Sequence, residues 1–174
     1  MSQQKILSNG LRVVYERLPD VRSVSTGVWI AAGSRFEPAS RNGISHFIEH
    51  MLFKGTERRS AKQIAETIED IGGEINAFTS KEFTCFYTKT LDAHLGVSMD
   101  LLSDMMFHSQ FLDAEMEKEK KVVREEIRMV EDTPDECSME LLTEKAWEGD
   151  PVGWPILGVE DTLSSIARAR PGRW

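Results

Sequence analysis

The first thirty residues contain short apolar stretches separated by turn-forming residues, which is the pattern of strands joined by tight turns. Residues 5–7 and 11–15 flank Ser8-Asn9-Gly10, and Asn-Gly is the strongest short signal for a hairpin. A third strand is expected at residues 23–30, before the turn-prone residues 32–34. The N-terminal segment therefore predicts a hairpin followed by one further strand.

Helical spacing of apolar residues begins at Gly43 and continues to Lys54. A second helix is expected from Ser60, whose side chain can cap the helix together with Gln63. Three isoleucines give this helix an apolar stripe, and two glycines end it. These residues are Ile64, Ile68, Ile71, Gly72 and Gly73.

Strand patterns return at residues 74–80 and 83–90, where polar and apolar residues alternate and aromatic residues are frequent. Residues 95–108 then form a helical pattern, and a long charged helix is expected at about 113–131. The apolar positions of the first of these helices are Leu95, Met99, Leu102, Met105 and Met106.

A last helix is expected to begin near Thr133 and to continue toward Trp147. Thr133 and Glu136 have the spacing of a capping box, and Pro134 occupies the first helical position. The order of strands, helices, a hairpin and more helices predicts an α+β fold. In this fold an antiparallel or mixed sheet packs against several helices.

The composition is that of a soluble globular domain and argues against several partners. Of 174 residues, 40% are hydrophobic and 29% are charged. The net charge of -8 argues against nucleic acid and anionic membrane, and it is compatible with basic peptide substrates. No apolar signal segment and no run of roughly 18 apolar residues occurs. Cys85 and Cys137 are too few for a disulfide framework, so we expect reduced thiols in a cytoplasmic protein.

The helix at residues 43–54 contains a motif with a specific chemistry, His46-x-x-Glu49-His50. Two histidines four residues apart lie about 40° apart around a helix, so both can reach one metal ion. Glu49 lies on the same side of this helix. The apolar residues fall on the other side, and these are Ile44, Phe47, Ile48, Met51 and Leu52. This separation of the two faces favours a metal site.

The motif is the reversed form of the common zinc-protease signature, the form that defines the inverzincins. A catalytic zinc ion takes three protein ligands and keeps one position for water. His46 and His50 supply two ligands. Glu49 is placed to accept the proton of the water as general base, because zinc lowers the pKa of bound water to near neutrality.

The third ligand is expected from the long charged helix. Its apolar stripe runs through Val123, and Glu126 and Glu119 both border that buried stripe. Glu125 points in the opposite direction, into solvent. We therefore predict Glu126 as the third zinc ligand and Glu119 as a supporting carboxylate behind the ligands.

Simpler explanations exist for each of these patterns. A charged run such as residues 115–131 usually forms a solvated face, and a His-x-x-Glu-His string alone can be accidental. A structural zinc site would be closed by four ligands, but Cys85 and Cys137 do not have the spacing for it. His94 and His108 have no partner at ligand spacing, so surface or capping roles are expected for them.

At these residues the chain resembles the pitrilysin/insulinase family of zinc metalloproteases, and within it the bacterial proteases that are similar to mitochondrial processing peptidase. The motifs are GISHFIEHMLFKGT at 43–56, GGEINAFTS at 72–80 and VVREEI at 122–127. The resemblance extends from about Leu7 to Thr162. It implies an α/β-roll domain, one Zn²⁺ per chain with Glu126 as the distal ligand, and a bacterial cytoplasmic location.

The resemblance also implies further site residues. Family members bind peptide as an added strand on a sheet edge, which here corresponds to Asn76, Ala77 and Phe78. An ordinary edge strand is also compatible with this segment. Processing peptidases hold substrate arginines with acids that match Glu136 and Glu140, although exposed glutamates on a helix need no special explanation. Glu119 takes the place of a supporting acid in the catalytic site.

Family members consist of two related halves that close around the substrate, and each half is longer than this chain. Residues 1–166 are therefore expected to be an incomplete zinc-binding N-terminal peptidase domain, and the arginine-rich residues 167–174 to mark a truncation. The expected partners are a peptide substrate and the missing half or a second subunit, and a homodimer stays open. The expected function is zinc-dependent cleavage of extended, presequence-like peptides. The alternative is a non-catalytic peptide-binding or assembly fragment that binds zinc but lacks the half needed for turnover.

Overall fold

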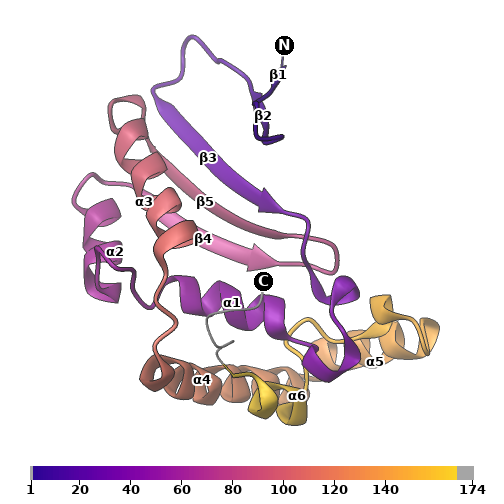
Figure 1. The fold of residues 1–174 in the computed structure, drawn as a ribbon. Helices are drawn as coiled ribbons and strands as arrows, with labels where there is room; N and C mark the ends of the chain where they lie inside the picture. Colours follow the sequence, from indigo (N-terminus) through magenta and orange to yellow (C-terminus); the bar gives the residue numbers. More distant parts are fainter. Residues whose placement is uncertain (1, 168–174) are drawn as a thin grey trace.

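The main sheet contains three antiparallel strands whose spatial order differs from their order in the sequence (Figure 1). The structure is a computed structural model that describes residues 2–167. β3 (Ser23–Ile30) and β4 (Glu74–Thr79) both pair with β5 (Thr84–Leu91), which lies between them. β4 is therefore an edge strand of this sheet. The predicted α+β fold with an antiparallel sheet is confirmed.

The predicted N-terminal hairpin is also present, but it forms a separate two-stranded sheet. β1 (Gln3–Ile6) and β2 (Arg12–Tyr15) pair antiparallel. At the turn, the Gly10 N–H donates to the carbonyl of Leu7, and Gly10 adopts a φ of 86°. This left-handed conformation explains why glycine follows asparagine here.

Six α-helices accompany these strands in the described part of the chain. They are α1 (Ile44–Leu52), α2 (Ala61–Glu69), α3 (Leu95–His108), α4 (Asp113–Asp132), α5 (Pro134–Ala146) and α6 (Glu160–Ser165). Four short 3-10 helices join them: η1 (Ser34–Phe36), η2 (Ala39–Arg41), η3 (Asp92–His94) and η4 (Pro151–Gly153). The predicted capping box of α2 is present, because Ser60 and Gln63 bond each other's backbone N–H.

Helix α1 lies between the sheet and α4, with β4 on one side and α4 on the other (Figure 1). Two clusters of buried side chains hold it there. The first joins α1 to α4 and α6 and contains Phe47, Met51, Met116, Val123, Ile127, Leu163 and Ile166. The second joins the end of α1 to α2, α3 and the sheet and contains Leu52, Ile64, Ile68, Phe86, Leu101, Leu102 and Met105. The position of α1 is therefore fixed from two sides.

The loop after α1 is attached to α3 by a buried carboxylate. Asp104 of α3 is fully buried, and its Oδ2 accepts hydrogen bonds from Thr56 Oγ1 at 2.8 Å and from Arg59 Nη1 at 2.6 Å. Arg59 also bonds Asp100, one turn earlier on α3, at 2.5 Å. This network holds residues 56–59 against the helix.

Two details of the predicted elements are wrong. Thr133 is the N-cap residue of α5 and Pro134 is its first residue, as predicted, but the capping box does not form, because the Thr133 hydroxyl donates to the carbonyl of Met129 and makes no cap hydrogen bond. Ile48 belongs to the apolar face expected for α1 but is exposed, whereas Phe47, Met51 and Leu52 are buried. Of the apolar positions in α3, Leu102 and Met105 are buried, whereas Leu95 and Met99 are exposed.

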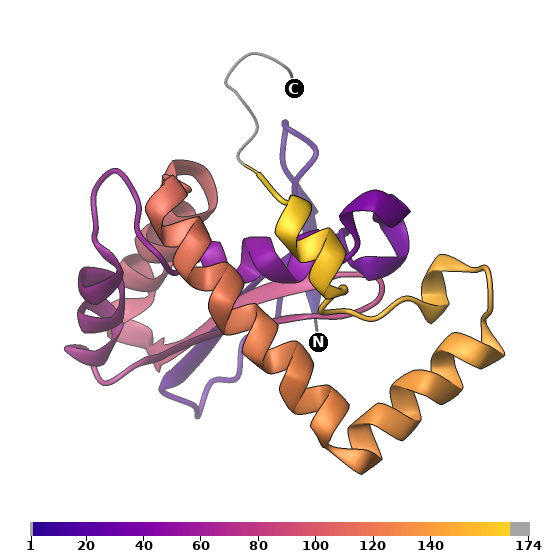
Figure 2. The same ribbon diagram turned by 90° about the horizontal axis from the view of Figure 1, so that it is seen from below.

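Helices α4 and α5 diverge like the two arms of a V when the molecule is viewed from below (Figure 2). No residue of α5 is buried in the described structure. None of the helices within residues 2–167 is both long and apolar enough to cross a membrane. The predicted arginine-rich tail at 167–174 lies, apart from Ala167, outside the described residues.

Candidate metal centre

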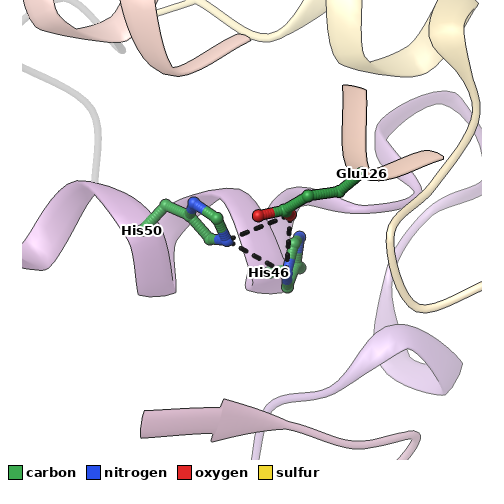
Figure 3. A group of neighbouring side chains, drawn as sticks. All are labelled: His46, His50 and Glu126. Carbon is green, nitrogen blue, oxygen red and sulfur yellow. Dashed lines mark hydrogen bonds and ion pairs between the residues drawn. The ribbon is translucent and has the colours of Figure 1, made fainter. Parts of the chain in front are cut away.

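The two motif histidines of α1 and one glutamate of α4 point toward one another (Figure 3). His46 Nε2 and His50 Nε2 lie 3.1 Å apart. Glu126 Oε2 lies 3.4 Å from His50 Nε2 and 3.8 Å from His46 Nε2. Among residues 2–167, these side chains are the only group of three or more His, Cys, Asp or Glu residues whose ligand atoms all lie within 4.8 Å of one another.

These spacings fit a tetrahedral zinc ion. Zinc–nitrogen and zinc–oxygen bonds of about 2.0–2.1 Å at tetrahedral angles place the ligand atoms roughly 3.3 Å apart. The three observed separations of 3.1, 3.4 and 3.8 Å fall close to that value. Two imidazoles and one carboxylate also leave a fourth position for water, as in catalytic zinc sites. No cysteine belongs to the group, which argues against a closed structural site.

Glu119 orients His50 from behind. Its Oε1 lies 2.9 Å from His50 Nδ1, and its side chain is only 5% exposed. A carboxylate accepts but does not donate, so Nδ1 carries the proton in this contact. The proton-free Nε2 of neutral His50 is then the atom that faces His46 and Glu126.

His46 is held as a neutral imidazole. Burial, assisted by the neighbouring His50, lowers the pKa of His46 to about 4. Its Nδ1 is buried and has no hydrogen-bond partner. A neutral imidazole is the form that binds a metal ion, so the environment of His46 favours the ligand form at neutral pH.

Glu49 faces the sheet, and its carboxylate is held at the end of β4. Its Oε2 accepts a hydrogen bond from Thr79 Oγ1 at 2.5 Å. Burial raises the pKa of Glu49, and the hydrogen bond from Thr79 opposes this change. The residue next to the candidate ligand His50 is thus a half-buried carboxylate beside a sheet edge, which suits a general base.

Glu37 and Gly43 fix the first turn of α1, and of these two residues only Gly43 is expected from the sequence. Buried Glu37 accepts hydrogen bonds from the backbone N–H of Gly43 and of Ser45, each at 2.7 Å, and so caps the helix. Gly43 has a φ of 91°, and a Cβ there would lie 2.5 Å from the carbonyl oxygen of Leu157. Glu37 lies six residues before Gly43, the N-cap residue of α1, and a capping acid at this distance has no short sequence signature.

The structure separates the two neighbouring glutamates of α4. The side chain of Glu126 is 32% exposed and faces the histidines, whereas that of Glu125 is 70% exposed and pairs with Arg128 at 2.9 Å.

The predicted peptide-binding residues Asn76, Ala77 and Phe78 lie on β4 beside α1 and not among the converging ligand atoms. Asn76 Oδ1 accepts from the Ala77 N–H at 2.8 Å.

The two predicted arginine-binding acids lie on α5, and the structure places them differently. Glu140 lines a groove of about 360 Å³ between α4, α5 and residues 153–159, together with Glu131 and Glu144. Glu136 does not line it. The groove also contains Lys81, whose Nζ donates to the carbonyl of Trp154. Burial raises the pKa of Glu140 and lowers that of Lys81, and the attraction between the two groups opposes both changes.

An inverted His-x-x-Glu-His helix, a distal glutamate and an open antiparallel sheet edge together define a domain of the inverted-motif metallopeptidase class. Residues 12–160 match the insulinase family, peptidase family M16. The chain belongs to this family.

Two curated proteins of similar sequence support the assignment to this family. The chain is 53% identical over 166 residues to YmxG, an uncharacterized zinc protease of Bacillus subtilis. This match covers 95% of this chain and 41% of YmxG. It is 43% identical over 162 residues to a probable mitochondrial-processing peptidase subunit beta of Arabidopsis thaliana, covering 93% of this chain and 30% of that protein.

A solved structure of a protease from Helicobacter pylori shares the fold. Its TM-score is 0.91 at 28% identity, and the match covers 96% of this chain and 41% of the other. The predicted family resemblance is confirmed. The chain spans about two fifths or less of the length of the curated relatives described here.

Proposed function

We propose that this chain supplies the zinc-binding site of an endopeptidase that hydrolyses extended peptides. The observation that carries the proposal is the convergence of His46 Nε2, His50 Nε2 and a Glu126 oxygen within 4.8 Å. A bound zinc ion would supply an activated water and polarise the scissile carbonyl. Names of relatives that include zinc protease support the assignment.

In this proposal, Glu49 is the general base and accepts a proton from the attacking water. Its carboxylate is adjacent in sequence to His50, and the Thr79 hydroxyl holds it toward β4. Glu119 keeps His50 in the tautomer whose Nε2 faces the site. Hydrogen bonds with Thr79 and His50 hold the carboxylates of Glu49 and Glu119 in these positions.

The substrate backbone would bind along β4. One side of β4 pairs with β5, and the other side is a sheet edge that lies beside α1 (Figure 1). An extended peptide adds to such an edge through main-chain hydrogen bonds. The Ala77 N–H, which now donates to Asn76 Oδ1, would instead donate to a substrate carbonyl. Because Glu49 contacts Thr79, the scissile bond would lie near the last residues of β4.

Basic substrate side chains would enter the groove beside α5. Glu131, Glu140 and Glu144 line it, and Ile127, next to Glu126, forms part of its wall. Glu136, the other predicted arginine-binding acid, lies outside this groove. Carboxylates of this kind pair well with arginine guanidinium groups.

The alternative function is that of a zinc-binding fragment without turnover. The chain matches only 41% of the length of its Bacillus subtilis relative, so residues that stabilise the transition state can lie in the remaining part. Zinc binding and catalysis are therefore tested separately.

The experiment begins with zinc content, measured by elemental analysis on the wild-type chain and on two neighbouring variants. We expect about one zinc per wild-type chain, a strong loss in Glu126→Gln and no loss in Glu125→Gln, because only Glu126 faces the histidines. Equal zinc in all three proteins would remove Glu126 as a ligand.

Cleavage of an unstructured basic peptide follows, with the wild-type chain and Glu49→Gln. We expect zinc-dependent cleavage by the wild type and a loss of about 10²-fold or more in Glu49→Gln, which should retain zinc. Stoichiometric zinc in a wild-type chain that cleaves no peptide would instead favour the non-catalytic fragment.

A further inference from the structure

Lys54 lies just after α1 and faces the carboxylate that orients His50. Its Nζ is 2.7 Å from Glu119 Oε2, while Glu119 Oε1 is 2.9 Å from His50 Nδ1. Each oxygen of Glu119 therefore has its own partner. The three side chains form a continuous path from the ammonium group to the nitrogen that faces the metal site.

The burial of Glu119 makes this ammonium group significant. The Glu119 side chain is 5% exposed and that of Lys54 is 31% exposed. A buried carboxylate needs a counter-charge or several hydrogen bonds. His50 cannot provide the charge while it serves as a ligand, because a metal-bound imidazole is neutral at the ring. Within residues 2–167, the ion pairs of Glu119 are with His50 and Lys54, so Lys54 is its cation.

The backbone holds Lys54 in place. Its N–H donates to the carbonyl of Met51 at 3.0 Å, and the N–H of Phe53 donates to the carbonyl of His50 at 3.2 Å. Lys54 is thus fixed to the end of the helix that carries both histidines, four residues after His50.

We propose that Lys54 is a positioning residue of the zinc site. It fixes the Glu119 carboxylate so that this group accepts the His50 Nδ1–H and leaves the His50 Nε2 aimed at the metal. The inference rests on the proposed zinc site, and it adds a residue that touches no ligand atom of the metal itself.

A positioning role for Lys54 predicts that loss of its ammonium group weakens zinc binding, whereas charge repulsion alone predicts stronger binding. A cation close to the site repels a zinc ion, so removal of the Lys54 charge by itself would strengthen zinc binding. Removal of a residue that orients a metal ligand weakens zinc binding, and zinc affinity then typically falls by about 10- to 100-fold. The direction of the change in zinc affinity therefore separates the two roles.

The test is the zinc dissociation constant of the full chain, measured by chelator competition. We expect Lys54→Met to bind zinc about tenfold more weakly than wild type. Lys54→Arg, which keeps a cation at this position, should recover most of the affinity. Lys118→Met is the matched control, because Lys118 also pairs with an acid of α4, but this acid is Glu115 at 2.6 Å and not Glu119, and the Lys118 side chain is 68% exposed. This control should leave zinc affinity unchanged.

A double-mutant cycle tests whether Lys54 acts through Glu119. If it does, Lys54→Met adds little to the loss already caused by Glu119→Gln, since the acceptor is already changed. Nitrogen NMR of the metal-free histidines gives a second readout. The His50 Nδ1–H tautomer should dominate in wild type and Lys54→Arg and decrease in Lys54→Met.

Several results would overturn the inference. Unchanged or tighter zinc binding by folded Lys54→Met contradicts it, as do fully additive losses in the cycle or an unchanged His50 tautomer. A wild-type chain that binds no zinc defeats the proposed function itself, which is a different outcome. Circular dichroism of each variant verifies that the fold is retained.

Discussion

Single residues in this site are tuned by their surroundings, and His46 shows the largest effect. Burial lowers its pKa to about 4, whereas the same side chain in the unfolded chain has an ordinary pKa near 6.5. Between these values the unfolded chain binds a proton at His46 and the folded chain does not. Protonation therefore favours the unfolded chain in this interval, and stability due to His46 is lost as pH falls from about 6.5 to about 4.

This linkage predicts how the metal-free chain responds to acid. In zinc-free buffer, the free energy of unfolding should fall between pH 6.5 and 4, with a contribution from His46 of up to roughly 3 kcal/mol. Urea unfolding at several pH values measures it. His46→Gln should show a flatter pH dependence, whereas His94→Gln, outside the site, should resemble wild type. Identical slopes in wild type and His46→Gln would contradict the assignment.

The residues that sequence analysis could identify are those whose helix position reveals their direction. The facial position of Glu126 on α4 predicted that it points inward, and the structure places its side chain toward both histidines. Lys54 and Glu37 were not identified, since both lie outside regular helix and act through contacts with distant elements. Ile48 is exposed although it belongs to the expected apolar face, because α1 packs through Phe47, Met51 and Leu52 and neither buried cluster contains Ile48.

At the scale of elements, local patterns predicted most strands and helices. β3 and α3 have the predicted bounds, and β4 and β5 lie within one residue of theirs. The order β3-β5-β4 was not predicted, since strand pairing depends on contacts that are distant in sequence. Helix α6 was missed because six residues are too few to show a helical period.

Buried Asp104 attaches the loop after α1 to α3, so its charge should contribute to the stability of the fold. Asp104→Asn should destabilise the fold by about 3 kcal/mol, because it removes the charge of a fully buried carboxylate and leaves Arg59 without that partner. Urea denaturation measures the loss.

Asp100→Asn is the matched control for Asp104→Asn. The Asp100 side chain is 44% exposed and pairs with Arg58 and Arg59 on the same surface. An exposed pair of this kind contributes about 0–1 kcal/mol. Comparable losses in both variants would show that burial does not decide the strength of this network.

At the scale of the whole molecule, the proposed zinc site joins two elements that are far apart in sequence. His46 and His50 come from α1, and Glu126 comes from α4. A ligand that binds the folded chain only stabilises it by about 2.7 kcal/mol at a free concentration 100 times its dissociation constant. Zinc binding at the proposed site would therefore be coupled to global stability.

We expect zinc to raise the melting temperature of the wild-type chain by roughly 5–10 °C at that concentration. Chelation by EDTA should reverse the shift. Glu126→Gln should show a much smaller shift, and Glu125→Gln should respond as wild type does. Calorimetry with and without zinc measures these shifts, and an equal response of Glu126→Gln would argue that zinc stabilises the chain at another place.

The open edge of β4 has a consequence for the choice of substrate proteins. A peptide pairs with a sheet edge only as an extended strand, so a segment held in a helix or in another sheet must first be released. Under the proposed function, cleavage of a folded protein then follows the equilibrium population of its locally opened form. Two proteins with the same sequence at the cut site would be cleaved at different rates when their local unfolding free energies differ, so destabilised proteins would be degraded first.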